Sequence, residues 1–96
     1  DVCYFEKDLN DNYTFLYTKY NSYKINESII QIGKKLDDDP HFFKIHRSCI
    51  INLDNINYLD WNNSVIRVGQ YDVKLLTEHR KNKLKKLITD DMIINN

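Results

Sequence analysis

The stretch HFFKIHRSCIINLDNI, residues 41–56, decides the fold because one cationic residue, Arg47, interrupts its alternating strand pattern. Apart from position 47, apolar side chains recur there at every second position: Phe43, Ile45, Cys49, Ile51 and Leu53. This period of two is typical of a half-buried β-strand. The same period puts Arg47 on the apolar face, where an arginine is almost never buried without a partner. Either the strand breaks at residues 46–48 and turns Arg47 outward, or Arg47 has a buried partner.

Short strand patterns fill most of the remaining chain and favour a mainly β fold. They cover residues 2–7, 13–20, 23–26, 56–61, 65–68 and 71–76. Together with the opening stretch they amount to about seven strands. Asn- and Asp-rich turns separate several of them, as in DLNDN and at Asn21-Ser22. The spacing predicts a β-sandwich or an open barrel.

Two helices are predicted from their starting residues. Ser28 and Gln31 fit a capping box, in which the two side chains satisfy free backbone donors. That short internal helix ends before Pro40, because the residue before a proline disfavours helix. Thr77 can cap a final helix, whose apolar stripe is formed by Leu84, Leu87 and Ile88.

The length and the charge distribution limit the function classes. Ninety-six residues make one domain, and no apolar run approaches the ~20 residues of a membrane span. The net charge is zero, but it is unevenly spread. Residues 41–88 hold nine lysines and arginines against four acidic residues, whereas residues 1–40 hold five against eight. A basic second half is typical of a face that binds a polyanion.

Most of these cations lie in residues 80–86, which allow three interpretations. The run could be a solvated helix face, the default for such a pattern, or a helix lying on a membrane surface, for which it has few large apolar residues. It could also follow a phosphate backbone. Further cations, expected on strand ends or turns, would support that third interpretation: Lys44, Arg47 and Lys74.

Metal binding and catalysis are disfavoured. His41, His46 and Cys49 form H-x4-H-x2-C, but His46 and Cys49 would point to opposite faces of an extended chain. The sequence contains no phosphate-cradling glycine loop and no G-x-S-x-G elbow. An apolar run surrounds Cys49, which would raise its pKa and hide it. We therefore expect no enzyme and no cofactor. Cys3 and Cys49 are interpreted as buried, reduced thiols, with a disulfide as the weaker alternative.

The aromatic residues offer a second kind of binding. Seven Tyr, four Phe and one Trp could form a sheet face that stacks the bases of RNA or a single strand. Aromatic residues at alternate strand positions more often belong to the core, and the glycine-aromatic signature of such RNA-binding sheets is absent. An RNA- or single-strand-binding β module is therefore the alternative function.

Residues 42–59, FFKIHRSCIINLDNINYL, resemble the signature of LytTR DNA-binding domains, which is close to F-x-R-I-H-R-S-x-[LVI]-V-N-x-x-x-I. Lys44 stands where the family typically has Arg, and Ile51 where Val is usual. INESIIQIGKKL is similar to the family's short helix, and VKLLTEHRKNKLKKL to its closing strand and basic helix. The resemblance covers most of the chain, from about Val2 to Leu87.

The resemblance implies an elongated stack of antiparallel sheets with one short internal helix and a short C-terminal helix. It implies a cytoplasmic, sequence-specific double-stranded DNA-binding domain that inserts loops into the major groove of promoter DNA. Family members are usually effector domains of bacterial response regulators and often occupy direct repeats. We therefore expect residues 1–96 to be one domain excised from the C-terminal end of a longer regulator, with the receiver domain missing from this chain. A dimer on DNA is compatible with this expectation.

The resemblance also assigns roles to residues. Arg47 would read a base, because its fork matches guanine O6 and N7. Glu78 replaces a typical arginine of the family's L-S-R-R segment, so it would either turn away or read a cytosine, and the register there stays open by one residue. The DNA-contacting residues implied in this way are Asn12, Tyr13, His46, Arg47, His79, Arg80 and Lys81.

Overall fold

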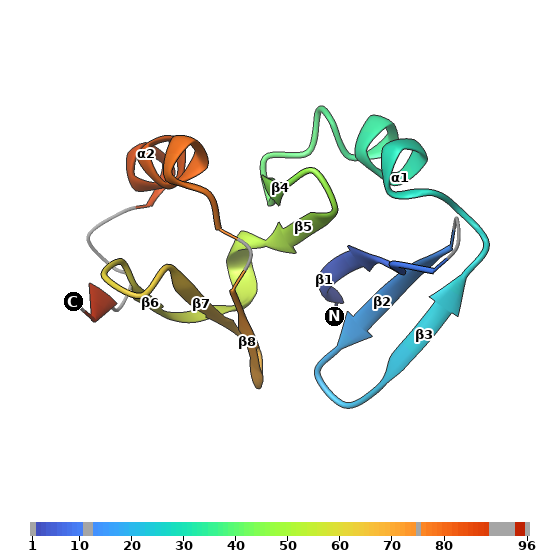
Figure 1. Ribbon diagram of the computed structural model, residues 1–96, viewed down its shortest axis with the longest axis horizontal. Coiled ribbons are helices and arrows are strands. Elements are labelled where there is room, and N and C mark those ends of the chain that lie inside the picture. Colours follow the sequence, from blue (N-terminus) through green and yellow to red (C-terminus); the bar gives the residue numbers. More distant parts are fainter. Residues whose placement is uncertain (1, 11–12, 75, 89–93, 96) are drawn as a thin grey trace.

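The computed structural model describes residues 2–10, 13–74 and 76–88, and the backbone of 94–95. These residues form two sheets with two helices along one side (Figure 1). The first sheet has the order β3-β2-β1-β5-β4, and its strands are β1 (Val2–Lys7), β2 (Thr14–Thr18), β3 (Ser22–Ile25), β4 (Phe42–His46) and β5 (Cys49–Asn52). The second has the order β8-β7-β6-β9, with β6 (Ile56–Asp60), β7 (Val65–Val68), β8 (Tyr71–Val73) and β9 (Ile94–Asn95).

The strand pairing confirms the mainly β, antiparallel prediction in most places. Only β9, beside β6, makes a parallel pair within the described part of the chain. Within the described residues the strands form two separate sheets, and neither closes on itself. The turn predicted at Asn21-Ser22 lies one residue earlier, because Ser22 already pairs with Tyr17 as the first residue of β3. The molecule extends 36 Å along its longest axis and 23 Å along its shortest, so it is elongated.

The two helices begin where their capping residues predict. Helix α1 (Ile29–Lys35) has a complete capping box: Ser28 Oγ accepts from Gln31 N, and Gln31 Oε1 accepts from Ser28 N. Helix α2 (Glu78–Leu87) is capped by Thr77, whose Oγ1 accepts from Arg80 N at 3.3 Å. Neither described helix has the length and apolar character of a membrane-spanning segment.

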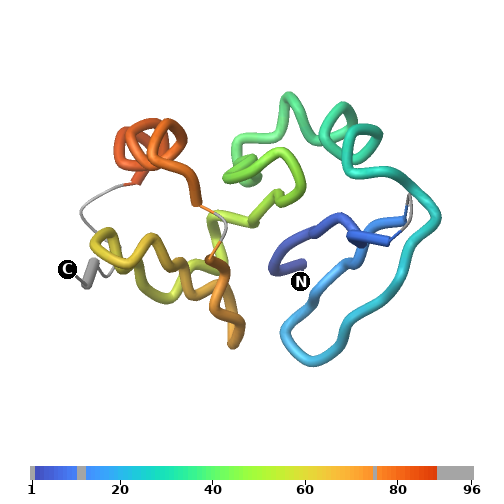
Figure 2. Tube along the Cα trace, viewed as in Figure 1, coloured from blue at the N-terminus to red at the C-terminus, as the bar shows by residue number. Residues whose placement is uncertain are grey.

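One apolar core connects the two sheets. Its fully buried side chains include Ile45 and Ile51 from the first sheet and Leu59 and Ile66 from the second. Leu84 fastens α2 to this core, whereas Leu87 is 54% exposed, so the helix buries a narrower stripe than predicted. The chain crosses between the sheets through the short 3-10 helix η1 (Leu53–Asn55), which Figure 2 shows near the middle of the molecule.

Strand β5 is buried on both faces, because α1 covers the face that points away from the main core. Ile50 packs there against Ile29 and Ile32 of α1. Cys49 and Ile51 pack on the opposite face, in the main core. This double burial explains why the three consecutive residues 49–51 are all apolar. Because β5 is held on both faces, it also fixes the position of the turn directly before it, at residues 47–48.

Candidate nucleic-acid interface

The strand breaks at Arg47, which resolves the first question raised by the sequence. Strands β4 and β5 are antiparallel, His46 pairs with Cys49, and Arg47 and Ser48 form the turn between them. The side chain of Arg47 is exposed, and within the described residues no hydrogen bond or ion pair engages its guanidinium. The break therefore presents an unpartnered cation to solvent at the tip of a hairpin.

The residues on either side of Arg47 hold this turn. His46 Nδ1 lies 2.8 Å from Ser48 Oγ and accepts a hydrogen bond from Ser48 N at 3.2 Å. Lys7 N donates to Ser48 O at 2.8 Å, which fastens the turn to β1. An Nδ1 that accepts from a backbone N–H leaves Nε2 as the ring donor of a neutral histidine. His46 and Ser48 thus have local partners, and Arg47 alone extends freely from the turn.

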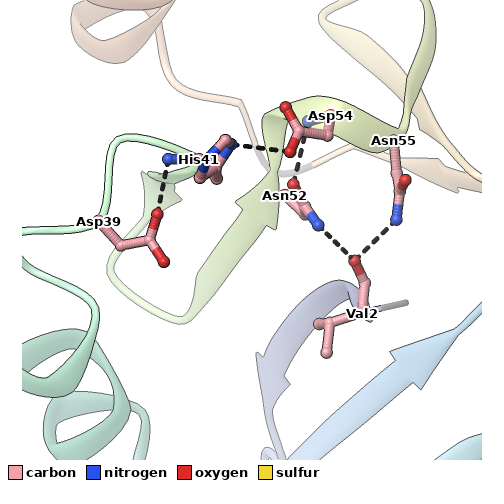
Figure 3. Close-up of polar contacts among 6 residues, drawn as sticks. All are labelled: Val2, Asp39, His41, Asn52, Asp54 and Asn55. Atoms are coloured by element: carbon pink, nitrogen blue, oxygen red, sulfur yellow. Dashed lines mark hydrogen bonds and ion pairs between the residues drawn. The ribbon is translucent and has the colours of Figure 1, made fainter.

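Asn52, at the other end of β5, has a structural position. Its Nδ2 donates to Val2 O at 2.9 Å, and Asn55 Nδ2 donates to the same oxygen at 2.8 Å (Figure 3). Asn52 Oδ1 accepts from Asp54 N and so caps η1. His41 Nδ1 lies 2.7 Å from Asp54 Oδ2, which connects the start of β4 to η1. These contacts fix β5 against β1 at the end of the hairpin that lies far from Arg47.

Two of the predicted contacts in α2 make bonds inside the domain. Arg80 Nη1 donates to Lys44 O at 2.7 Å, which joins α2 to β4. Lys81 Nζ donates to Trp61 O at 2.8 Å and lies 2.9 Å from Glu78 Oε2, and its side chain is only 12% exposed. Hydrogen bonding and charge from Lys81 hold the pKa of Glu78 below its ordinary value. Glu78 is therefore directed at Lys81 within its own helix.

His79 and Lys83 occupy the open side of α2. Together with Lys44 and Arg80 they line a hollow of about 330 Å³ between α2 and β4, so four basic side chains surround it. Two further hollows include Lys44: one of about 390 Å³ beside α1, and one of about 510 Å³ that also contains Arg47. Lys44 is thus the residue that connects the three hollows. The sequence places Lys44 at the family's arginine position and predicts it as a supporting cation at a strand end or turn, but not as a site residue. It lies instead in the middle of β4.

The loop between β1 and β2 is only partly described. Asn12 lies outside the described residues. Tyr13 is at the surface, where Lys24 Nζ lies 4.6 Å from its ring centroid. Leu9, which the sequence did not single out, is largely exposed and lines the same hollow as Arg47.

The other candidate chemistries find no site in the described residues. No group of three His, Cys, Asp or Glu side chains lies together there as metal ligands would. Both cysteines are free and buried, and burial raises the pKa of Cys49, with the Glu6 carboxylate raising it further. His46 is engaged by Ser48, and Cys49 lies in the core.

Three aromatic residues of the sheets form core contacts instead of an open stacking face, whereas Tyr20 and Tyr23 are exposed. Tyr4 and Tyr17 stack with ring centroids 4.3 Å apart. Tyr71 meets both rings edge-on, at 5.5 Å and 5.3 Å. Tyr4 belongs to the buried core, and the other two pack against it. These rings are therefore occupied by one another, which disfavours base stacking on this part of the sheet.

Comparison with known proteins identifies a family. The family model described as "LytTr DNA-binding domain" matches residues 1–89. Among solved structures, the LytTr DNA-binding domain of a protein described as a DNA response regulator from Bacillus cereus matches with a TM-score of 0.71 and 19% sequence identity. The match covers 90% of this chain and 79% of that one, and at this identity the likeness concerns the fold. No curated protein sequence matches the chain significantly.

Proposed function

The chain belongs to the LytTr DNA-binding domain family, and we propose on this premise that it binds double-stranded promoter DNA sequence-specifically. In this proposal the turn between β4 and β5 enters the major groove, and Arg47 reads a base there. The family consists of DNA-binding domains and not of enzymes, so the proposal needs no catalytic step.

The main support for this proposal is the guanidinium of Arg47, which extends to solvent from a turn held by hydrogen bonds. A guanidinium fork can donate two parallel hydrogen bonds to guanine O6 and N7. It can do so only if no protein group already occupies it, and no partner engages Arg47 within the described part of the chain. The bonds from His46 and Lys7 limit how far the turn can move, which lowers the ordering entropy lost on binding.

The cations beside the turn would contact phosphates. His79, Lys83 and Lys44 share one hollow, and Lys44 also lies beside Arg47. Phosphate contacts orient a protein on the duplex and carry no direct sequence information. We assign this role to Lys83 and Lys44, and to His79 as a further DNA contact. His46, Arg80 and Lys81 become positioning residues in the proposal, because each has a partner inside the domain.

We place the domain in a cytoplasmic bacterial regulator of transcription, as the effector part of a response regulator. Binding to direct repeats, a dimer on DNA, and a receiver domain elsewhere in a longer chain belong to the same proposal. The RNA- or single-strand-binding alternative is weaker, because Tyr4, Tyr17 and Tyr71 stack on one another and not on an open face.

The test is a binding experiment with three nucleic acids. A preferred duplex is first selected from a random pool. The domain is then titrated with this duplex, with a scrambled duplex and with the separated strands. The proposal predicts tightest binding to the selected duplex and an affinity that falls roughly 100-fold between 50 and 200 mM salt. Equal binding to both duplexes, or tighter binding to single strands, would contradict it.

A further inference from the structure

Two exposed apolar side chains from different elements meet beside Arg47. Leu9, on the loop after β1, is 90% exposed, and Ile30, in the first turn of α1, is 62% exposed. Both line the hollow of about 510 Å³ that also includes Arg47. One exposed leucine on a surface needs no explanation. Two large aliphatic groups lining one hollow indicate a surface suited to an apolar ligand group.

Local structure holds each of these side chains in place. Asp8 Oδ1 accepts from Asn10 N at 3.0 Å, so a tight turn encloses Leu9. Asp8 N also donates to Tyr13 O at 3.0 Å across the loop. Ile30 follows the buried Ile29 at the start of a fully capped helix, which directs it away from the core. Leu9 is therefore presented by a hydrogen-bonded turn, and Ile30 by the first turn of a capped helix.

The charges around this hollow suit a nucleic acid. Lys7, Lys44 and Arg47 line it together with the aliphatic groups, and none of the described residues that line it is a carboxylate. Its ligand must therefore offer negative charge and a small apolar group within a few ångströms of each other. The edge of a thymine in the major groove does so, because its 5-methyl group projects into the groove between phosphates and beside the acceptors of the next base pair.

We propose that Leu9 and Ile30 contact the 5-methyl group of a thymine next to the guanine that Arg47 reads. This inference rests on the proposed function and adds a second recognised base to it. The pair of aliphatic residues would then select thymine over cytosine at that position, because cytosine presents an amino group and no methyl group there.

The experiment removes the methyl group from the DNA and leaves its hydrogen bonds unchanged. Each thymine of the selected duplex is replaced in turn by deoxyuridine. One replacement, adjacent to the guanine at which Arg47→Ala loses discrimination, should weaken wild-type binding by roughly fourfold, as expected for one buried methyl group. Leu9→Ser and Ile30→Ser should weaken binding to the thymine duplex and respond much less to that replacement. The difference between the effect of deoxyuridine on the wild type and its effect on a serine variant measures the interaction of that side chain with the methyl group.

Leu87→Ser is the matched control, because Leu87 is an exposed leucine at the end of α2, outside this hollow. It should keep the full response to deoxyuridine.

The inference is overturned if no thymine beside that guanine responds, or if Leu9→Ser responds like the wild type. Either result, with the selected duplex still preferred over the scrambled one, leaves the proposed function standing. Loss of that preference in the wild type would overturn both. Binding of the hollow to anionic vesicles without any methyl effect would assign it to a membrane surface and also overturn the inference.

Discussion

His46 Nδ1 and Ser48 Oγ lie 2.8 Å apart across Arg47, so the two neighbours of the proposed base-reading residue are bonded to each other. The backbone N–H of Ser48 donates to the same nitrogen. This arrangement fixes a two-residue turn at the end of a hairpin and leaves its first side chain free. In the proposed function, His46 would therefore act on DNA only through the shape of the turn.

His46→Ala should lower affinity for the selected duplex several-fold and change the free energy of unfolding by about 1 kcal/mol or less. The physical reason is a looser turn, which must be ordered when DNA binds. Titration with DNA and thermal unfolding of the same samples check this. Ser48→Ala is the graded comparison, because it removes Oγ and keeps the N–H bond to His46. An equal loss of affinity for selected and scrambled duplexes in His46→Ala would assign His46 to phosphate contact.

Arg80→Ala should destabilise the domain by about 1–3 kcal/mol, because it leaves the Lys44 carbonyl, which is partly buried, without its donor. Lys83→Ala is the contrasting change in the same helix. It should leave the unfolding midpoint unchanged and lower the salt slope of DNA binding by at most ~1. Urea unfolding and salt titrations of both variants separate the two roles. An Arg80→Ala domain of normal stability would show that the bond to Lys44 is dispensable.

Some of these assignments could be predicted from the sequence, and the reasons are local. The break at residues 46–48 follows from one cation in an apolar alternation, and each helix start follows from the capping residue directly before it. The roles of Arg80 and Lys81 could not be predicted in this way. Their partners, Lys44 O and Trp61 O, are 36 and 20 residues distant in sequence. Periodicity identifies which helix face is buried, but not which carbonyl lies opposite a given side chain.

The same limit applies to the hollow beside Arg47. Leu9 lies in a turn-forming segment and Ile30 in a helix, and no sequence spacing relates them. Only the packing of α1 over β5, through Ile29, Ile32 and Ile50, brings that helix to the hairpin. The exposure of Leu87 has a similar cause, because α2 meets the core through Leu84 alone among its buried side chains.

Glu6→Gln should stabilise the domain at neutral pH, and the gain should disappear in acid. Burial raises the pKa of the Glu6 carboxyl in the folded state, so ionisation of this group disfavours folding. Stability contributed by the protonated form is present below the unfolded pKa and is lost as the pH rises through the folded pKa. Unfolding of both proteins from about pH 3 to pH 7 measures the difference. A glutamine variant that is less stable at pH 7 would indicate that Glu6 makes a favourable charged interaction.

Cys49 should react slowly with thiol reagents in the folded domain. Burial raises its pKa, so little thiolate is present, and the side chain is inaccessible in the core. Cys49→Ala should destabilise the fold by roughly 1 kcal/mol and leave DNA affinity near normal. Thiol labelling before and after addition of denaturant, with Cys3→Ala to isolate the second thiol, checks this prediction. Rapid labelling of native Cys3→Ala protein would show that Cys49 is open to solvent.

The proposed reading of a base by Arg47 is tested by comparing Arg47→Lys with the wild type on selected and scrambled duplexes. Lysine keeps the positive charge but lacks the guanidinium fork. Arg47→Lys should lose roughly 1–3 kcal/mol of discrimination between the duplexes, while its affinity for the scrambled duplex and its thermal unfolding stay the same. Arg67→Lys is the control, because Arg67 Nε is bonded to Asp72 Oδ1 at 3.0 Å on the second sheet, and it should discriminate like the wild type. Full discrimination by a folded Arg47→Lys domain would contradict the claim.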